Sequence, residues 1–358
     1  MKNSGMIPAI LALALFCGWL AIRARRARRP IVKWTGVILA GLVALLSAFV
    51  AIAALIGVIR LVYPVTAPPA TLEVTGSPEQ VERGKRLAYL CVGCHSSSDE
   101  LPLDGGPALD VGPIATFYPS NLTPGGPLAE WSDGEIIRAI RDGVNKDGRA
   151  LLIMPSEQYH TMSDADVQAL VAYLRTQPPA DRQLPETEVT LLGAMLIGIG
   201  VFPLSTRPPT TEPVVAPPPE ASPEYGRYLV NISGCRECHG EDLQGGTSDF
   251  VPIGPSLPAV VPQWSADEFV ETMRTGVDPS GHSMDRELMP WDDFSDAYSE
   301  EELAAIYEYI RTLSPPEVTG DQPIDAVVLG TLLNETGDGL FIRQRSPSGP
   351  QCGNGCLP

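Results

Sequence analysis

Residues 91–95 read Cys-Val-Gly-Cys-His, and residues 235–239 read Cys-Arg-Glu-Cys-His. Both stretches have the form Cys-x-x-Cys-His, which is the attachment pattern of haem c. Two thiols at this spacing lie on one turn, where each can add to one vinyl group of the porphyrin. The adjacent histidine then lies under the iron as its proximal ligand. We therefore predict two covalently attached haem c groups, bound by Cys91, Cys94 and His95 and by Cys235, Cys238 and His239.

Zinc sites and thioredoxin-like redox pairs also contain Cys-x-x-Cys. A zinc site needs a second cluster of Cys or His at ligand spacing, and none follows either stretch. A thioredoxin-like pair needs a β-α-β context, which the flanking sequence does not suggest. The haem interpretation is therefore favoured.

The chain contains two copies of one unit. Residues 131–179 begin Trp-Ser-Asp-Gly-Glu and residues 264–316 begin Trp-Ser-Ala-Asp-Glu, and both close with a helical pattern and Pro-Pro. Upstream, Gly84-Lys-Arg-Leu precedes one Cys-x-x-Cys-His and Gly226-Arg-Tyr-Leu precedes the other. The self-similarity predicts two tandem domains at 77–178 and 223–316 that differ mainly in loop length.

Each copy is predicted to be mainly α-helical. Serines suited to helix N-caps are followed three residues later by Gln, Glu or Asp. These pairs are Ser77/Gln80, Ser132/Glu135, Ser163/Asp166, Ser265/Glu268 and Ser299/Glu302. Apolar residues at helical spacing follow the caps, and no long alternating β pattern occurs. A small helical unit with long loops has little apolar core, and a haem would fill it.

The sixth iron ligand is expected downstream of each histidine. Met154 and Met289 occupy the same place in the two copies, and each precedes a proline. A thioether ligand raises the reduction potential of haem iron. The alternatives are His160 and His282, which do not align with each other. We therefore expect Met154 and Met289 to complete His/Met ligation of the two irons.

Two apolar stretches dominate the first sixty residues. Met6–Ile22 and Trp34–Ile59 contain no charge and are long enough to span a bilayer. The basic cluster between them is expected to remain in the cytoplasm. We predict a membrane anchor over residues 1–62, with helices at about 6–22 and 34–60, and the remaining chain on the periplasmic or extracellular side of the cytoplasmic membrane. A cleaved signal peptide and a single span at 34–59 are the alternatives, and both export the same domains.

The charge of the chain is divided unevenly. The first 62 residues carry +8 and the whole chain carries −18, so the rest carries −26. So acidic a body is not expected to bind nucleic acid. It suits either a well-solvated surface or docking to a basic protein.

Three further segments carry weaker signals. Residues 179–222 are predicted to be a Pro-rich linker whose apolar run, Val189–Leu204, is too short for a membrane span. We expect that run to form a helix packed on a domain or lying at the membrane surface. Residues 317–358 are predicted to form an extended tail. In it, Cys352 and Cys356 either form a small disulfide or lie in a disordered end. Cys17 is expected to be inert.

Each copy resembles a class I cytochrome c domain, and the pair with its anchor is similar to the cytochrome subunits of membrane-bound alcohol and gluconate dehydrogenases. The resemblance covers about residues 77–316. Besides Cys-x-x-Cys-His, it rests on Gly106-Pro107 and Gly254-Pro255, Asn121-Leu-Thr-Pro, the Trp-Ser turns, the Met-Pro pairs and the final helices.

The resemblance also implies supporting contacts. It implies that the carbonyl of Pro107 orients His95 and that the carbonyl of Pro255 orients His239. It further implies that the first and last helices of each domain cross at a glycine against an aromatic ring. The pairs would be Gly84 with Tyr173 and Gly226 with Tyr309.

The expected fold is therefore mainly α, with two class I cytochrome c domains in tandem after an N-terminal transmembrane helical hairpin. Two six-coordinate irons leave no open position for a substrate, so we expect electron transfer and no enzyme activity. The expected partners are membrane lipid and a redox protein, such as a dehydrogenase, a quinol-oxidising complex, an oxidase or a reaction centre. The alternatives are a dihaem peroxidase, which needs one displaceable iron ligand, and a sensor or assembly subunit.

Overall fold

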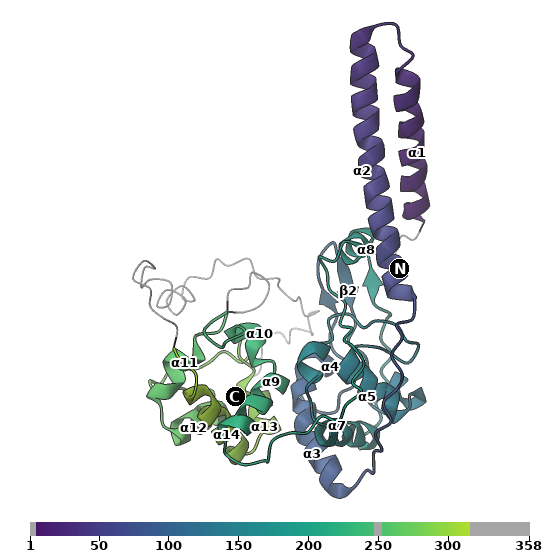
Figure 1. The fold of residues 1–358 in the computed structure, drawn as a ribbon. Coiled ribbons are helices and arrows are strands. Elements are labelled where there is room, and N and C mark those ends of the chain that lie inside the picture. The colour runs from purple at the N-terminus through teal and green to yellow at the C-terminus, as the bar shows by residue number, and fades with distance from the viewer. Residues whose placement is uncertain (1–4, 247–252, 316–358) are drawn as a thin grey trace, which may run out of the picture. The chain divides into compact units, whose positions relative to one another are not determined.

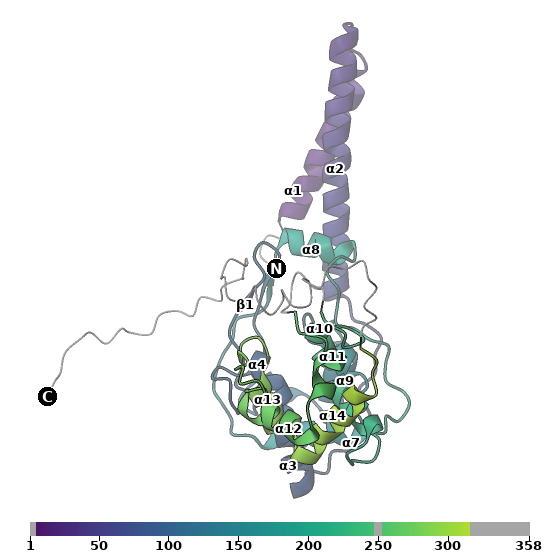
Figure 2. The ribbon, with the colours of Figure 1, turned by 90° about the vertical axis from the view of Figure 1, so that its left-hand side faces the viewer.

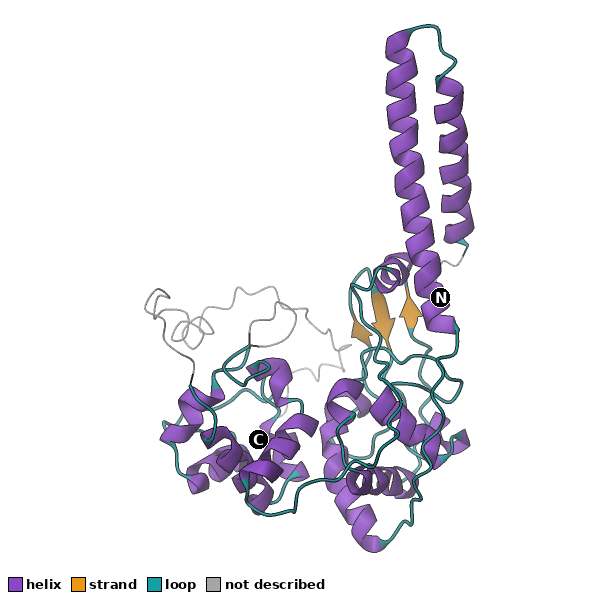
Figure 3. Cartoon of the chain, in the orientation of Figure 1, coloured by secondary structure: helices purple, strands orange, loops and turns teal. Residues whose placement is uncertain are grey.

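The computed structural model describes residues 5–246 and 253–315, where a helical hairpin is followed by two helical repeats (Figures 1 and 3). The tail predicted at 317–358, with Cys352 and Cys356, lies outside the described residues.

Two long apolar helices, α1 (Met6–Ala24) and α2 (Pro30–Val62), form the hairpin. They run side by side (Figure 1). Both are long and apolar enough to cross a membrane, which confirms the predicted pair of apolar helices. Helix α2 begins four residues before the predicted start because Pro30 takes the first helical turn, where a missing N–H costs nothing.

The first repeat consists of short helices joined by long loops. Three of the predicted serine caps, Ser77, Ser132 and Ser163, accept hydrogen bonds from the backbone N–H three residues on. The helices are α3 (Pro78–Ala88), η1 (Tyr89–Cys91), α4 (Val92–His95), η2 (Pro127–Glu130), α5 (Asp133–Asp142), α6 (Ser156–Tyr159) and α7 (Asp164–Thr176).

The second repeat has the same helical plan. Ser265 and Ser299 form full capping boxes with Glu268 and Glu302, as predicted. The helices are α9 (Pro223–Ile232), α10 (Cys235–His239), α11 (Leu257–Val260), η3 (Val261–Gln263), α12 (Ala266–Thr275), α13 (Trp291–Ala297) and α14 (Glu300–Arg311).

The first and last helices of each repeat cross at a glycine, as the resemblance implied. A Cβ on Gly84 would lie 1.8 Å from the carbonyl oxygen of Ala169 and 2.9 Å from Cβ of Tyr173. A Cβ on Gly226 would meet Ala305 and Tyr309 at the same two distances. Only glycine allows backbones to approach this closely.

A small antiparallel sheet accompanies the first repeat, which the sequence did not predict. Its strands lie in the order β1 (Leu109–Asp110), β2 (Ala115–Phe117) and β3 (Glu188–Val189). Leu109 pairs with Phe117, and Ala115 pairs with Val189. Strands of two or three residues are too short to show an alternating pattern, so they leave no periodic signal.

The apolar run of the linker forms helix α8 (Leu191–Gly198). It packs on α2 and on the sheet, and residues of all three form one apolar cluster. A second, larger core is continuous through both repeats and includes Leu87, Val92, Leu229 and Leu303. The two repeats therefore pack on each other through buried apolar side chains.

Candidate functional site

Both Cys-x-x-Cys-His sequences form a helical turn directly after the first helix of their repeat. In the first repeat this turn is η1 and α4, and in the second it is α10. Val92 is fully buried under the first turn and anchors it to the core. In each repeat the two cysteines and the histidine therefore belong to one short turn fixed on a packed helix.

Cys91 and Cys235 pack against the apolar core of the repeats. Burial raises the pKa of Cys91 to about 12, and the neighbouring Cys94 adds to the shift. Burial likewise raises the pKa of Cys235 to about 12. A structural zinc site needs four ligands, and among the described residues no three His, Cys, Asp or Glu side chains lie close enough to hold a metal ion together.

Each histidine of these turns points Nδ1 at a backbone carbonyl. His95 Nδ1 lies 2.8 Å from the carbonyl oxygen of Ser120, and His239 Nδ1 lies 2.8 Å from that of Pro255. Burial lowers the pKa of both imidazoles, and the contact with the carbonyl only partly opposes this. A neutral ring whose Nδ1–H is donated in this way keeps Nε2 as the free metal-binding nitrogen.

The expected contact between the carbonyl of Pro255 and His239 is thus present. The prediction that the carbonyl of Pro107 contacts His95 is wrong, because the carbonyl of Ser120 takes that place. The backbone pattern gives the reason. Leu122 N–H donates to the carbonyl of Leu103 at 2.8 Å, and Leu257 N–H donates to that of Leu243 at 2.9 Å. Counting back two residues from each of these equivalent leucines leads to Ser120 and Pro255.

Gly106 of the first repeat is equivalent in structure to Gly246 of the second repeat, and not to Gly254, which the shared Gly-Pro motif suggested. Its N–H donates to the carbonyl of Pro119, as Gly246 N–H donates to that of Gly254. The β1–β2 hairpin is inserted after Gly106 and moves Pro107 away from the histidine. The Gly-Pro pairs of the two repeats therefore look alike in sequence but occupy different places.

The two Met-Pro turns are alike in structure. Ser156 N–H donates to the carbonyl of Met154 at 2.8 Å, and Trp291 N–H donates to that of Met289 at 2.7 Å. Both methionines are half-buried against the core that Cys91 and Cys235 also contact.

The residue before Met154 supports a functional role for this turn. Ile153 has a φ of 63°, which is unfavourable for a β-branched residue. Backbone strain of this kind is concentrated at ligand-binding segments.

The alternative histidines are placed differently. His160 Nδ1 lies 3.1 Å from the carbonyl oxygen of Arg141 and 3.5 Å from Oδ1 of Asp142. His282 is exposed in a turn, where its backbone N–H donates to Asp278. The two histidines thus have no common position in the repeats.

Two buried polar atoms of the second repeat are consistent with a bound polar group. Trp291 Nε1 and Ser256 Oγ have no hydrogen-bond partner among the described residues. Trp291 lies two residues after Met289, and Ser256 directly follows Pro255. Haem propionates are acceptors of the type that these donors lack, so the residues present fit a haem.

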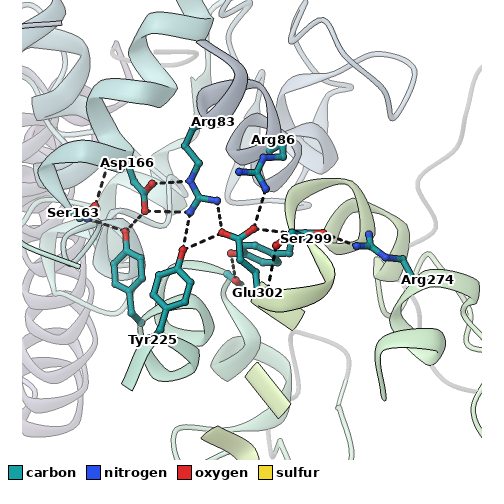
Figure 4. Close-up of polar contacts among 11 residues, drawn as sticks. Arg83, Arg86, Ser163, Asp166, Tyr225, Arg274, Ser299 and Glu302 are labelled. Atoms are coloured by element: carbon teal, nitrogen blue, oxygen red, sulfur yellow. Dashed lines mark hydrogen bonds and ion pairs between the residues drawn. The ribbon is translucent and has the colours of Figure 1, made fainter. Parts of the chain in front are cut away.

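A buried ionic network joins the two repeats (Figure 4). Arg83 of α3 donates from Nε to Asp166 of α7 at 2.8 Å and from Nη1 to Glu302 of α14. Tyr225 of α9 donates to Glu302 at 3.0 Å, and Tyr228 donates to Asp166 at 2.5 Å. Each carboxylate thus receives donors from both repeats.

The guanidinium of Arg83 is held in its charged form. Asp166 and Glu302 are 7% and 6% exposed. Burial lowers the pKa of Arg83, but Asp166 and Glu302 raise it by more, so its net pKa is above the ordinary value. The two repeats are therefore joined by a fixed polar contact in addition to their common apolar core.

Sequence reasoning missed Ser120 and the network around Arg83. A signal for Ser120 exists in the chain, because Pro119-Ser-Asn-Leu matches Gly254-Pro-Ser-Leu at its leucine, with the Pro-Ser pair one residue out of register. The network joins residues up to 219 positions apart, and no local pattern marks it.

Known protein families match both repeats. Residues 81–178 match the family Cytochrome c, and residues 221–310 match the family Cytochrome C oxidase, cbb3-type, subunit III.

Three curated relatives extend this result. The chain is 27% identical to "Diheme cytochrome c-type" of Cereibacter sphaeroides, over 69% of this chain and 90% of that protein. It is 26% identical to the fructose dehydrogenase cytochrome subunit of Gluconobacter japonicus, over 55% of this chain and 45% of that protein. It is 33% identical to the gluconate 2-dehydrogenase cytochrome c subunit of Pantoea cypripedii, over 44% of this chain and 37% of that protein.

The chain spans less than half of the length of its dehydrogenase relatives, from 19% to 45% of each. Two cytochrome c domains imply two covalent haem c groups. The chain is therefore a dihaem c-type cytochrome and an electron carrier, homologous to the cytochrome subunits of fructose and gluconate dehydrogenases.

Proposed function

We propose that this cytochrome is the membrane-anchored electron-relay subunit of a dehydrogenase complex, acting on the outer face of the cytoplasmic membrane. The observation that carries the proposal is the pair of attachment turns in repeats that have one continuous core and a buried ionic contact. Such a pair holds two redox centres at a fixed separation. The fructose and gluconate dehydrogenase relatives are cytochrome subunits by name, which favours a dehydrogenase as electron donor.

In this proposal one haem is attached at Cys91 and Cys94 and the other at Cys235 and Cys238. His95 and Met154 ligate the first iron, and His239 and Met289 ligate the second. The carbonyls of Ser120 and Pro255 hold the histidine rings in the tautomer that leaves Nε2 for iron. The haem supplies reversible one-electron chemistry when bound, and the protein sets its potential and orientation.

The outer-face location is supported by the hairpin. Ile7 at the start of α1 packs in the cluster that contains Ala115 and Phe117 of the first repeat. If both helices span the bilayer, the N-terminus and the repeats then lie on one side. The basic residues from Arg23 to Lys33 lie at the other end, which the positive-inside rule assigns to the cytoplasm.

Gentle detergent purification from native membranes, with mass spectrometry of the bound proteins, tests this proposal. We expect a stoichiometric flavoprotein or quinoprotein dehydrogenase, whose substrate reduces the haems within the purified complex. A chain with His95→Ala and His239→Ala is the control, because it should keep the partner but lose substrate-driven reduction. Recovery with an oxidase, a reaction centre or a quinol-oxidising complex, or of the chain alone, would contradict the dehydrogenase assignment.

A further inference from the structure

We propose that residues 191–202, which contain α8, lie in the headgroup layer on the outer face of the cytoplasmic membrane and contact phospholipid there. In this position they fix the first haem domain directly on the membrane anchor. The inference rests on the proposed membrane anchor and adds a second lipid-binding surface to it.

The length of α2 sets the depth of this surface. Its 33 residues extend about 50 Å at 1.5 Å per residue, whereas the hydrocarbon core of a bilayer is about 30 Å thick and takes about 20 residues. Lys33 lies over the ring of Trp34, 5.6 Å from its centroid, which suits the inner boundary of the core. Counting from Trp34, the core ends near Ala53. The headgroup layer outside the core is about 5–7 Å thick, so residues 54 to about 57 of α2 lie in it at 1.5 Å per residue.

Helix α8 contacts this outer part of α2. A Cβ on Gly57 would lie 1.8 Å from the carbonyl oxygen of Ala194, and a Cβ on Gly198 would lie 1.8 Å from that of Ala53. Small residues four positions apart on both helices thus allow close backbone packing. Arg60 donates from Nη1 to the carbonyl of Ile197 at 2.9 Å, at the carboxyl end of α8. Figure 2 shows α8 where the hairpin meets the first repeat.

The outward side of this segment is apolar. Leu192, Ile199 and Val201 are 38%, 45% and 66% exposed, and residues 191–202 contain no charged side chain. They continue the exposed apolar surface of α2, which includes Ile59. Apolar surface buried at the membrane interface stabilises binding in proportion to its area.

The side chain of Arg60 beside this surface is positively charged and so complements the negative phosphate of a phospholipid. Arg60 is the one basic residue of α2 after Lys33, and among the described residues it forms no ion pair with a carboxylate. It lines an open surface pocket of about 450 Å³ together with Tyr63 and Phe202. A guanidinium with free N–H groups binds phosphate well, so the open pocket suits a phospholipid headgroup.

The same surface is linked to the loop that holds the first haem histidine. Thr190 N–H donates to the carbonyl of Ile114 at 3.1 Å, and Thr190 Oγ1 donates to that of Pro113 at 2.6 Å. Residues 107–118, which carry β1 and β2, thus dock on α8. They lead directly to Ser120, the residue opposite His95. The insertion that moved Pro107 away from His95 therefore connects the first haem turn to the membrane surface.

Photo-crosslinking in native membranes tests this contact. p-Benzoylphenylalanine is introduced singly at Val201, at Leu45 in the middle of α2, and at Val215. Val215 is the matched control, because it is a valine of the same linker and is 83% exposed. Phospholipid adducts are detected by the mass of the intact, haem-loaded chain, and its visible absorption confirms folding. We expect adducts at Val201 and Leu45 and at least tenfold less at Val215.

The possible results separate the two proposals. Adducts at Leu45 without adducts at Val201 would overturn the α8 contact and leave the anchor standing. Equal adducts at Val201 and Val215 would also overturn it, because the lipid contact would then be unspecific. Absence of adducts at all three positions would overturn the membrane anchor itself.

Discussion

Arg83→Met is the substitution that most directly tests how the two haem domains are joined. Arg83 is largely buried and bridges Asp166 of one domain and Glu302 of the other. Methionine keeps much of the length and apolar volume of arginine but removes the charge. The variant therefore leaves two buried carboxylates without their shared cation.

The size of the effect follows from what remains around each carboxylate. Removing one partner of a buried ion pair costs about 3–5 kcal/mol of folding stability. Glu302 keeps Arg86 at 3.0 Å and the hydroxyl of Tyr225, and Asp166 keeps the hydroxyl of Tyr228. We therefore expect a loss of about 3 kcal/mol, at the lower end of that range.

A pH signature accompanies this loss. Burial raises the pKa of Glu302, but Arg83 and the Ser299 N–H lower it by more, so its pKa in the folded chain is below the ordinary value. The stabilisation from this group is present above the unfolded-state pKa and is lost as pH falls through the folded-state pKa. Wild type and Arg83→Met should therefore become closer in stability below about pH 4.

Urea unfolding of the haem-loaded chain in detergent, at pH 7 and at about pH 3, measures both effects. The matched control is Lys146→Met, which removes an exposed ion pair with Glu130 and should cost less than about 1 kcal/mol. Two outcomes would refute this account of the network: a cost of Arg83→Met no larger than that of Lys146→Met at pH 7, or a cost that is unchanged at about pH 3.

Three further substitutions have expected results. Gly57→Val places a side-chain carbon against the carbonyl of Ala194. It should lower folding stability by about 1–3 kcal/mol and expose the linker to limited proteolysis. At the control position Gly41 an added carbon meets no atom within 4 Å, so Gly41→Val should have neither effect. Met154→His should lower the reduction potential of one haem in a redox titration and leave the other unchanged, and two unchanged potentials would remove Met154 as a ligand. Burial and the neighbouring Asp292 raise the pKa of Asp293 to about 6, so this carboxyl adds stability as pH falls from about 6 to 4. In urea, wild type should therefore gain stability relative to Asp293→Asn over this range, and Glu301→Gln, which changes an exposed carboxylate, should show the same gain relative to Asp293→Asn.

The features that sequence predicted correctly are those encoded at short, fixed spacings. The serine caps and the paired apolar helices depend on residues within one element. The Gly-against-Tyr helix crossings, which join distant helices, were implied by the resemblance to class I cytochrome c domains. A capping serine and its partner three residues on define a helix start because the contact is local. The family matches also agree with the two tandem domains inferred from the repeat.

The features that sequence missed depend on distant contacts or on insertions. Pro107 was assigned to His95 because a Gly-Pro pair occurs in both repeats, but the inserted hairpin changes the register and Ser120 takes that place. The short strands leave no periodic signal because they have only two or three residues. The pairing of β3 with β2 is also distant, since the two strands lie some 70 residues apart. The Arg83–Glu302 contact crosses from one domain to the other, and an arginine on a helix gives no sign of such a partner.

A pyridine haemochrome assay on the purified chain tests the central claim most directly. The account predicts two c-type haems per chain, one in the Cys91→Ala/Cys94→Ala variant and one in Cys235→Ala/Cys238→Ala. Cys17→Ala, in the first apolar helix, should keep both. Fewer than two haems in the wild-type chain, or a count unchanged by either double substitution, would contradict the account of a dihaem electron carrier.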